Sequence, residues 1–402
     1  MSIEKYTPSQ ERAVKLIDEG NNLFLTGGPG TGKTALIQAI CEKWCASGKK
    51  VLMTATTGIA AASLPGGKTI HSTLGWRLGK KDYNYDECSE ALRDVDLLVV
   101  DEVSMLGTDV LQHLVKCLRS LEKEPQIIMS GDFFQLPPVN RQLHSSPLYP
   151  FENKEWWDLN LQPCFLEEVV RQKDAEFIAM LDKARVGDPL CIPYFNHRTN
   201  RKLIEGAITI CTRNDYADAI NNRKMNLLTG PSKHYYAVGD ADKANFDNSR
   251  IEEDLYVKQQ MRVMALRNDP KRRYQNGSLG TVMGMADDSI RVRFDNGNLV
   301  DIVRCMYELD VKGGGKGSVT VEQFPLKGGY AITIHKSQGQ TFDAINIHAP
   351  WCWDAGQLYV ALSRAKTIEG IHFMASINAN SLFADKRVIN FYNSLRCVGY
   401  AA

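Results

Sequence analysis

Residues 23–34 read Leu-Phe-Leu-Thr-Gly-Gly-Pro-Gly-Thr-Gly-Lys-Thr, and Ala-Leu-Ile-Gln-Ala-Ile follows them. The apolar start predicts a buried strand and the end predicts a helix, with a phosphate-binding loop between them. Glycines let successive backbone N–H groups converge on phosphates at the N-terminus of a helix. We therefore expect a nucleotide on this loop, with Thr34 as a magnesium ligand and with the phosphates held by Gly28, Pro29, Gly30, Thr31, Gly32 and Lys33.

Other short apolar runs surround this loop in the sequence, at residues 51–53, 97–100 and 127–129. They alternate with helical patterns and glycine-containing turns, which is typical of parallel strands in a doubly wound α/β domain. The run at 97–100 ends in Asp101 and Glu102. We expect Asp101 to hold the magnesium through water and Glu102 to act as general base on the attacking water. Gln135, after the run at 127–129, either senses the γ-phosphate or belongs to an ordinary turn.

Composition narrows the class of protein without naming a partner. The chain has 402 residues, 48 basic and 47 acidic side chains and 44% hydrophobic residues. No stretch of eighteen apolar residues occurs, so we expect no membrane span. Because the charges nearly cancel, binding of nucleic acid would need a local concentration of Lys and Arg.

The ten cysteines are scattered and include no Cys-x-x-Cys pair, which argues against a zinc or iron–sulfur site. Cys41 and Cys45 lie four residues apart on an expected helix and are interpreted as small core side chains. The N-terminus shows no secretory leader, so we expect a reduced, intracellular protein. It would be cytoplasmic in a bacterium or virus, and a nuclear or mitochondrial location stays open.

The pattern of apolar and polar residues changes twice in the second half of the chain. Helical spacing at 177–185 and the run Ile208-Thr-Ile-Cys predict a second α/β unit, to which strands at 344–348 and 370–374 also belong. Between them, residues 290–303 alternate apolar and polar around Asn296-Gly297, a strong hairpin signal in a small antiparallel barrel. The glycine-rich residues 313–317 are expected to form a flexible loop.

Two segments of the second α/β unit place polar and cationic groups among apolar runs, at residues 331–341 and 357–365. An arginine such as Arg364, carried by a second domain, reaches the γ-phosphate only when two domains close. Hydrolysis of the nucleotide would then depend on closure of the two domains.

An ordered set of motifs now resembles the Pif family of superfamily 1B DNA helicases, over nearly the whole chain from Thr7 to about Leu395. Two of them, Gly131-Asp-Phe-Phe-Gln-Leu-Pro-Pro-Val and His335-Lys-Ser-Gln-Gly-Gln-Thr, favour this family over the related Dda and RecD helicases. The set also includes Gln10, the phosphate loop, Met53-Thr-Ala-Thr-Thr-Gly-Ile-Ala-Ala, Thr69-Ile-His-Ser, Val100-Asp-Glu-Val-Ser-Met, Val170-Arg-Gln and Tyr359-Val-Ala-Leu-Ser-Arg-Ala.

The resemblance implies two RecA-like doubly wound parallel-sheet domains, with an SH3-like β-barrel inserted in the second and a small wedge insertion in the first. The expected boundaries are 1–165 for the first domain, with the wedge at about 72–96, then 166–254 with 325–402 for the second domain, and 255–324 for the barrel.

It also implies an ATP- and Mg²⁺-dependent motor, monomeric when free, that moves 5′ to 3′ along single-stranded DNA and unwinds duplex with a 5′ tail. In such a motor Gln10 reads the adenine, Gln135 couples the γ-phosphate to DNA, Arg171 and Arg364 are arginine fingers, and Gly339 adjoins the nucleotide. The resemblance assigns DNA contacts to Thr56, Thr57, His71, His335, Lys336 and Ser337.

Strand separation needs a wedge, and aromatic side chains interleaved with cations between His71 and Asp94 suit stacking on bases. This segment carries Trp76, Tyr83 and Tyr85 with Arg77, Lys80 and Lys81. Trp76 is expected to contact DNA, although a place in the core explains it equally well. A second basic cluster, from Arg262 to Arg273 with Tyr274, would hold incoming DNA or form a solvated loop.

Three other functions stay open at this point. A translocase would strip proteins from single-stranded DNA without unwinding it. A nucleotide-gated DNA clamp would bind with negligible turnover, and a small-molecule kinase would pass phosphate to an acceptor. Intact Lys33, Glu102 and Arg364 argue against the clamp, and the motifs of the second domain argue against the kinase.

Overall fold

The structure is a computed structural model that describes residues 6–75, 85–138, 148–170, 174–198, 202–246, 249, 251–271, 273–274, 276–312 and 318–397. It divides into two compact units. The first comprises Met1–Ile204 and Ser337–Ala402, and the second comprises Glu205–Lys336.

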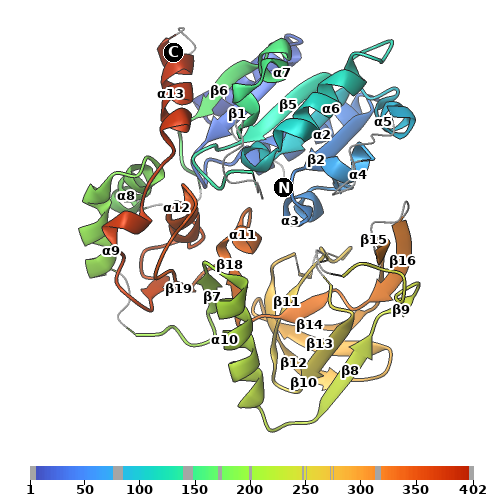
Figure 1. The fold of residues 1–402 in the computed structure, drawn as a ribbon, viewed down its shortest axis with the longest axis vertical. Helices are drawn as coiled ribbons and strands as arrows, with labels where there is room; N and C mark the ends of the chain where they lie inside the picture. Colours follow the sequence, from blue (N-terminus) through green and yellow to red (C-terminus); the bar gives the residue numbers. More distant parts are fainter. Residues whose placement is uncertain are drawn as a thin grey trace. The chain divides into compact units, whose positions relative to one another are not determined.

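The first unit contains a six-stranded parallel sheet with the order β3-β2-β4-β5-β1-β6 (Figure 1). Its strands are β1 (Leu23–Gly27), β2 (Val51–Ala55), β3 (Lys68–Thr69), β4 (Leu97–Asp101), β5 (Gln126–Gly131) and β6 (Gln162–Leu166). All neighbouring pairs run in parallel, as the apolar runs at 51–53, 97–100 and 127–129 predicted. The β3 and β6 strands were not predicted, since β3 has two residues and β6 begins Gln-Pro.

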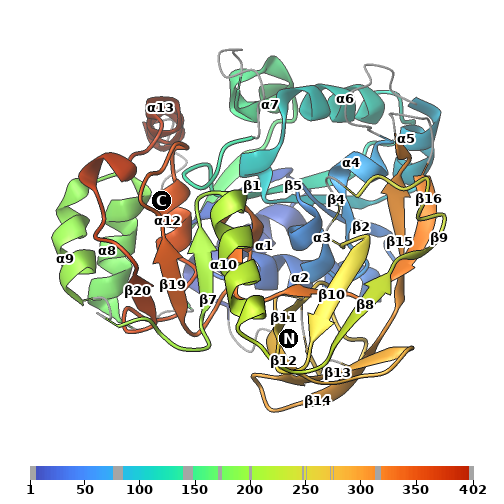
Figure 2. The ribbon, with the colours of Figure 1, turned by 60° about the horizontal axis from the view of Figure 1, so that its bottom comes forward.

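Helices cover both faces of this sheet, with α1 (Pro8–Asp18) and α2 (Lys33–Ala46) on one face and α6 (Thr108–Leu118) and α7 (Lys154–Asp158) on the other (Figure 2). Successive strand residues point to opposite faces. Leu23 and Leu25 therefore pack in the core with α1 and α2, whereas Phe24 contacts Trp156 of α7, with ring centroids 5.2 Å apart.

The remaining helices of this unit are α3 (Gly58–Ser63), α4 (Ile70–Thr73), α5 (Tyr85–Leu92), α8 (Ala175–Arg185), α9 (Ile192–Arg198), α12 (Gln357–Leu362) and α13 (Lys386–Leu395). The α8 helix confirms the helical spacing predicted at 177–185. The strands β19 (Ile345–His348) and β20 (Ile371–Phe373) pair in parallel, as predicted for 344–348 and 370–374.

The C-terminal α13 packs on the Phe24 face of the first sheet. Phe391 stacks on Phe151 with centroids 4.1 Å apart, and Tyr392 stacks on Phe134 at 4.9 Å. The Tyr392 hydroxyl also lies 2.7 Å from the Thr26 hydroxyl and accepts a hydrogen bond from the Phe133 N–H. Buried aromatic pairs contribute beyond the area that they bury, so residues after 385 complete the core around the first sheet.

The second unit combines a small parallel part with a larger antiparallel part. Strands β7 (Ile208–Cys211) and β18 (Ala331–Thr333) pair in parallel beside α10 (Asn214–Asn226). Helix α11 (Ile334–Ser337) spans the boundary between the units. The antiparallel strands are β8 (Ser232–Tyr236), β9 (Val238–Gly239), β10 (Asp254–Lys258), β11 (Arg262–Ala265), β12 (Leu279–Met285), β13 (Ser289–Phe294), β14 (Leu299–Val303), β15 (Cys305–Asp310), β16 (Ser318–Gln323) and β17 (Leu326–Gly328).

One apolar core holds most of these strands together, including Val263, Val282, Val292 and Ile302. Tyr235 of β8 belongs to the same core, and β8 pairs with β10. The antiparallel part therefore begins before Leu255, the boundary expected from the sequence. The β8 strand was not predicted because its residues show no alternating apolar pattern. Gly313–Gly317, expected as a loop, lies outside the described residues.

The predicted hairpin forms, with β13 and β14 paired from Ser289–Val303 to Arg293–Leu299. Gly297 has a φ of 89°, which favours glycine at that turn position. Arg291 and Asp301 face each other across the strands and form an ion pair at 2.7 Å.

Most of the described basic side chains on and between β11 and β12 form hydrogen bonds or ion pairs with residues of the second unit. Arg262 binds Asp295 at 2.6 Å, and Arg273 binds Asp269 at 2.7 Å. Tyr274 is buried and stacks on Phe294. Arg262 and Arg273 therefore have carboxylate partners, and both interpretations of this cluster, a DNA contact and a solvated loop, stay predictions.

Two expectations about cysteine need correction. Cys41 is buried in the core, as expected, but Cys45 is exposed because it falls on the outer face of α2. Cys88 and Cys117 form a disulfide, whereas the reduced protein expected from scattered spacings has none. Their residues are distant in sequence, and only the packing of α5 against α6 brings them together.

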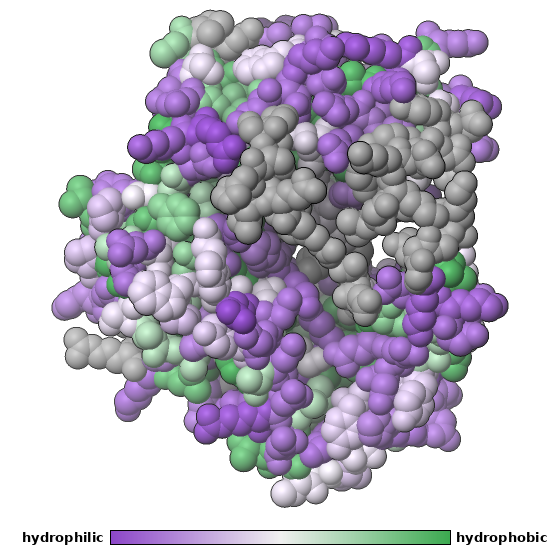
Figure 3. Space-filling model, in the orientation of Figure 1, coloured by the Kyte–Doolittle hydropathy of each residue, from purple (hydrophilic) through white to green (hydrophobic). Residues whose placement is uncertain are grey.

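Hydrophilic residues cover most of the face shown in Figure 3, where apolar residues appear as small separate patches. None of the helices in the described part of the chain has both the length and the apolarity of a membrane span.

Candidate active site

The phosphate-binding loop connects β1 to α2, as the sequence predicted. Gly30 and Gly32 both have a φ of 83°, in the left-handed region. A Cβ on Gly32 would also lie 2.9 Å from Gln10 Nε2. Glycine is thus required there on two counts, and the backbone N–H groups that begin α2 stay clear of side chains.

Lys33, the first residue of α2, folds back over the loop and donates to the carbonyls of Gly27 (2.8 Å) and Gly28 (3.0 Å). Burial lowers the pKa of the Lys33 ammonium from its ordinary value. The carboxylates of Asp132, Glu102 and Asp101 oppose this shift. The Lys33 ammonium therefore lies near three carboxylates, and a bound phosphate would add further negative charge around it.

Asp101 and Glu102 stand at the end of β4. Asp101 is buried, and its Oδ1 accepts a hydrogen bond from the Glu102 N–H at 2.9 Å. The Thr34 hydroxyl donates to Asp101 Oδ2 at 3.4 Å. These are hard oxygen donors beside a phosphate loop, which is the donor chemistry that Mg²⁺ prefers.

Glu102 has left-handed backbone angles, φ 55° and ψ 43°, a conformation uncommon for a residue with a side chain. Strained positions of this kind cluster at functional sites. Burial, and then the neighbouring Asp101, raise the pKa of the Glu102 carboxyl. A raised pKa suits a general base, which has to accept a proton near neutral pH.

Residues from the far end of the chain meet Glu102 within the first unit. Gln338 Nε2 donates to Glu102 Oε2 at 3.1 Å and to the Ser104 hydroxyl at 3.3 Å. Gly339 has a φ of 75°, and a Cβ there would lie 3.4 Å from Glu102 Oε1. The segment 337–340 thus borders the carboxylate expected to activate water.

Arg364 is buried directly behind that segment. Its guanidinium donates to the carbonyls of Gln340 (3.1 Å) and Ser337 (3.4 Å), and to the Ser363 hydroxyl at 2.7 Å. Its positive charge acts on Glu102, whose pKa it lowers. The Arg364 charge thus lies close enough to Glu102 to affect the pKa of its carboxyl. The role of Arg364 as an arginine finger stays a prediction.

The two predicted glutamines take different places. Gln10 is buried in the first turn of α1, exchanges hydrogen bonds with Thr7 and donates from Nε2 to the carbonyl of Thr31 in the loop at 3.2 Å. Gln135 is buried just after β5, and its Oε1 has no hydrogen-bond partner among the described residues. The adenine and γ-phosphate roles of these residues stay predictions.

Arg171 lies outside the described residues. The residue before it, Val170, donates its N–H to the carbonyl of Gly30 at 2.9 Å. Val170 also lies close to Gly32, where an added Cβ would meet its Cγ2 at 3.3 Å. The chain therefore passes beside the phosphate loop one residue before Arg171.

Sequence reasoning missed a buried network around Asp132, the residue after β5. Arg185 of α8 grips Asp132 through two nitrogens, with Nη2 to Oδ1 at 2.8 Å and Nε to Oδ2 at 3.0 Å. The Tyr359 hydroxyl of α12 donates to Asp132 Oδ2 at 3.0 Å. The motif containing Asp132 was the available signal, but nothing in the spacing of Arg185 identified its partner.

Of the predicted DNA contacts in the first unit, Thr56 and Thr57 have structural duties. The buried Thr56 hydroxyl donates to the carbonyl of Glu102 at 2.7 Å, and Thr57 caps α3 by accepting from the Ala60 N–H. His71 is half-buried on α4, and burial lowers its pKa, which favours the neutral imidazole. Trp76 lies outside the described residues.

The other DNA candidates lie on α11. Lys336 lines a hollow of about 350 Å³ within the second unit, together with Lys327, Glu252 and Asn214. His335 precedes it and is half-buried, whereas Ser337 is fully buried. A contact of the Ser337 hydroxyl with DNA thus stays a prediction that needs local exposure.

Known proteins match this arrangement closely. A PIF1-like helicase model matches residues 5–188, and a UvrD-like helicase C-terminal domain model matches residues 328–367. The ATP-dependent DNA helicase Pif1 of Bdellovibrio bacteriovorus is 32% identical, over 96% of this chain and 91% of the relative. The chain belongs to the PIF1-like helicase family. It is accordingly an ATP-dependent DNA helicase, and its nucleotide is ATP.

Solved structures of the family agree over the full chain. Bacteroides Pif1 bound to single-stranded DNA has a TM-score of 0.78 and 32% identity, with 99% of each chain covered. Pif1 helicase from Candida albicans has a TM-score of 0.83 and 27% identity, covering 98% of this chain and 100% of that chain. The α/β fold with RecA-like parallel-sheet domains is confirmed.

Proposed function

We propose that this PIF1-like helicase moves 5′ to 3′ along single-stranded DNA and unwinds the duplex ahead of it by ATP hydrolysis. The observation that carries the proposal is the meeting of Glu102 with Gln338, and of Arg364 with the carbonyls on either side of Gln338. Residues far apart in sequence thereby share one hydrolysis site. The direction of movement rests on the motif resemblance.

The chain's own groups divide the work of hydrolysis. Lys33 releases the carbonyls of Gly27 and Gly28 and turns to the β- and γ-phosphates, and the N–H groups at the start of α2 hold their oxygens. Glu102 accepts a proton from the attacking water, which Gln338 helps to orient through the carboxylate. Arg364 neutralises the charge that develops on the γ-phosphate.

Thr34 and Asp101 would hold Mg²⁺, which would neutralise phosphate charge when it is bound. The 3.4 Å separation of Thr34 Oγ1 and Asp101 Oδ2 already places two hard oxygens at one point of the loop. We also propose Gln10 as the adenine reader and Gln135 as the γ-phosphate sensor. The buried Gln135 side chain is held beside Asp132 by its N–H bond to that residue's carbonyl at 2.9 Å.

The motor also needs a link between nucleotide and DNA. Thr56 donates to the carbonyl of Glu102 and adjoins the helix cap at Thr57, so movement of Glu102 is transmitted to this loop. We propose that Thr57 and His71 in the first unit and His335 and Lys336 on α11 contact the DNA backbone. Backbone contacts suit an enzyme that moves along any sequence.

Unwinding of two matched duplexes, one with a 5′ tail and one with a 3′ tail, tests the proposal. We expect strand separation of the 5′-tailed duplex with ATP and a more than tenfold slower rate with the 3′ tail. Lys33→Ala is the negative control, and Lys43→Ala, an exposed lysine on the same helix paired with Asp18, is the matched positive control. Equal rates on both tails, or a preference for the 3′ tail, would contradict the assigned direction.

A protein-displacement assay on biotinylated single strands with bound streptavidin separates the alternatives. Displacement without strand separation would make the protein a translocase. ATP turnover that single-stranded DNA does not raise would favour a clamp.

A further inference from the structure

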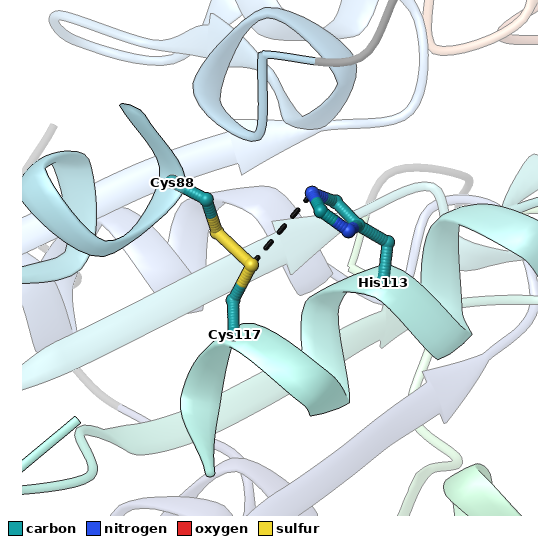
Figure 4. Close-up of side chains that lie close together, drawn as sticks. All are labelled: Cys88, His113 and Cys117. Atoms are coloured by element: carbon teal, nitrogen blue, oxygen red, sulfur yellow. Dashed lines mark hydrogen bonds between the residues drawn. A yellow bond between two sulfur atoms is a disulfide. The ribbon is translucent and has the colours of Figure 1, made fainter. Parts of the chain in front are cut away.

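Cys88 and Cys117 form a buried cross-link between two helices of the first unit (Figure 4). Cys88 lies on α5 and Cys117 on α6, and both side chains are fully buried. Their Cα atoms are 6.4 Å apart, within the usual range for a disulfide. The Ser89 and Ser120 hydroxyls, 3.3 Å apart, join the same two elements at the surface.

A histidine accompanies the pair. His113 lies one turn before Cys117 on α6, and its Nε2 is 3.7 Å from Cys117 Sγ and 3.2 Å from the carbonyl of Leu74. Burial lowers the pKa of His113, so its imidazole is neutral at neutral pH. A proton on Nε2 can be shared between the carbonyl and the sulfur, and a donor on the sulfur stabilises a thiolate.

The remaining eight cysteines are free, and among the described contacts none of them has a histidine nitrogen beside its sulfur, as Cys117 has. Burial raises the pKa of Cys41 and Cys211 to about 12 and that of Cys164 to about 11, with no such donor described at the sulfur to oppose it. The pair on α5 and α6 is thus chemically distinct within the chain.

We propose that Cys88 and Cys117 are a reversible oxidation site for a peroxide, with His113 as the positioning residue. The Cys117 thiolate attacks one oxygen of hydrogen peroxide and breaks the O–O bond; the hydroxide that leaves takes up the proton released by Cys117, which gives a sulfenic acid and water. The Cys88 sulfur then attacks that sulfur, and the hydroxide it displaces leaves as a second water with the Cys88 thiol proton. Overall, two thiols and one hydrogen peroxide give one disulfide and two waters, and a dithiol reductant reverses the change by exchange.

The site has a consequence for the catalytic strand. The two cysteines are 29 residues apart, and the loop that they close contains β4, Asp101 and Glu102. A cross-link restricts the unfolded states of such a loop and so favours the folded state. Oxidation therefore stabilises the segment that carries the hydrolysis carboxylates, at the cost of freedom between α5 and α6.

The intact protein is reduced, freed of reductant, treated with hydrogen peroxide, quenched in acid and alkylated for mass spectrometry. We expect ten alkylated cysteines before oxidation and eight after it, a linked peptide pair containing Cys88 and Cys117, and return to ten with dithiothreitol. The oxidised protein should melt several degrees higher than the reduced one. Retention of all ten free thiols, or linkage of other cysteines, would overturn the proposal.

Single substitutions test the role of each residue in disulfide formation. Cys88→Ser and Cys117→Ser should abolish the linked pair, whereas Cys45→Ser, an exposed free cysteine, should leave it unchanged. His113→Ala should slow disulfide formation about tenfold at pH 7 and shift the rise in rate to higher pH. An unaltered pH profile would remove His113 from the mechanism even where the variant is less stable.

A metal site is the competing explanation, because one ligand atom from each of the three residues lies within 4.8 Å of the others. Co²⁺ is therefore titrated into the reduced protein. A thiolate-to-cobalt absorption band that needs both cysteines and blocks disulfide formation would overturn the oxidation site. Absence of the band, with the disulfide forming as before, supports it.

Discussion

The first parallel sheet and the antiparallel part of the second unit use their charged residues in opposite ways. Asp101 and Asp132, at strand ends of the sheet, and Arg364, just after α12, are each at most 5% exposed. In the antiparallel part, the Arg291–Asp301 pair has side chains that are 56% and 50% exposed. Buried charges are costly unless they are paired, whereas exposed pairs contribute little. Buried charges that lower stability are therefore expected where the protein carries out chemistry. The exposed ion pairs of the antiparallel part are expected to change the free energy of unfolding very little.

Lys33→Ala should produce the largest effect, a loss of ATP hydrolysis of at least roughly 10³-fold. The change removes the loop's cation and its two hydrogen bonds to the carbonyls of Gly27 and Gly28, but it leaves the apolar core of the first unit intact, so folding should persist. Steady-state phosphate release and thermal unfolding measure the two properties. Turnover at the wild-type rate would show that the phosphate loop is misassigned.

Arg364→Ala should retain nucleotide binding but lose DNA-stimulated hydrolysis by a factor on the order of 10³. Fluorescent-nucleotide titration and phosphate release with oligo-dT separate binding from chemistry. Arg364→Lys keeps the charge and should restore only part of the rate, because ammonium lacks the planar fork that reaches both carbonyls. Unchanged stimulation in the alanine variant would remove Arg364 from the mechanism.

Glu102→Gln should lower hydrolysis by about 10²–10³-fold, since the amide cannot accept the proton from water. The raised pKa of Glu102 means that the folded state holds its proton more tightly than the unfolded chain. This carboxyl therefore destabilises the fold at neutral pH, and the effect is relieved as pH falls through the folded pKa. The neutral variant should melt a few degrees higher at pH 7.

In the wild type, kcat should fall on acidification at a pH above the range of an exposed glutamate. Glu252→Gln is the matched control, because the pKa of the Glu252 carboxyl is also raised, while its side chain lies on the surface of the second unit. It should leave DNA-independent hydrolysis unchanged and alter the melting temperature less than Glu102→Gln does. A lower melting temperature in Glu102→Gln would contradict the destabilising effect assigned to the ionised Glu102 carboxylate.

Arg185→Ala should destabilise the first unit by about 3–5 kcal/mol, because Asp132 is left as an unpaired buried charge. The Asp132 side chain is 0% exposed and that of Arg185 is 15% exposed. Chemical denaturation measures the change, and Asp132→Asn combined with Arg185→Met should recover most of it. A loss under 1 kcal/mol in the single variant would mean that the network is not held by this pair.

Arg291→Ala, on β13, should lower the free energy of unfolding by at most about 1 kcal/mol, which is the ordinary contribution of an exposed ion pair. The loss should diminish further in 1 M salt, which screens exposed charges. The same denaturation experiment checks it. A loss as large as that of Arg185→Ala would remove the distinction between the two regions.

The sequence by itself predicted the nucleotide loop and the existence of most of the parallel strands. Glycines at positions 30 and 32, Lys33 and the paired Asp101 and Glu102 act through local backbone geometry, so their spacing is sufficient to identify them. The Asn296-Gly297 turn was equally local. The short β3, the early β8 and the disulfide were missed because strand pairing and helix packing, not local pattern, define them.

Only the tertiary structure decided which distant residues share a site. It placed Gln338 on Glu102, Arg364 behind that contact, Arg185 and Tyr359 on Asp132, and Cys88 beside Cys117. These contacts cross from tens to hundreds of positions in the chain, and no periodicity encodes them. Their energies come from burial and charge pairing, which exist only once the elements have packed.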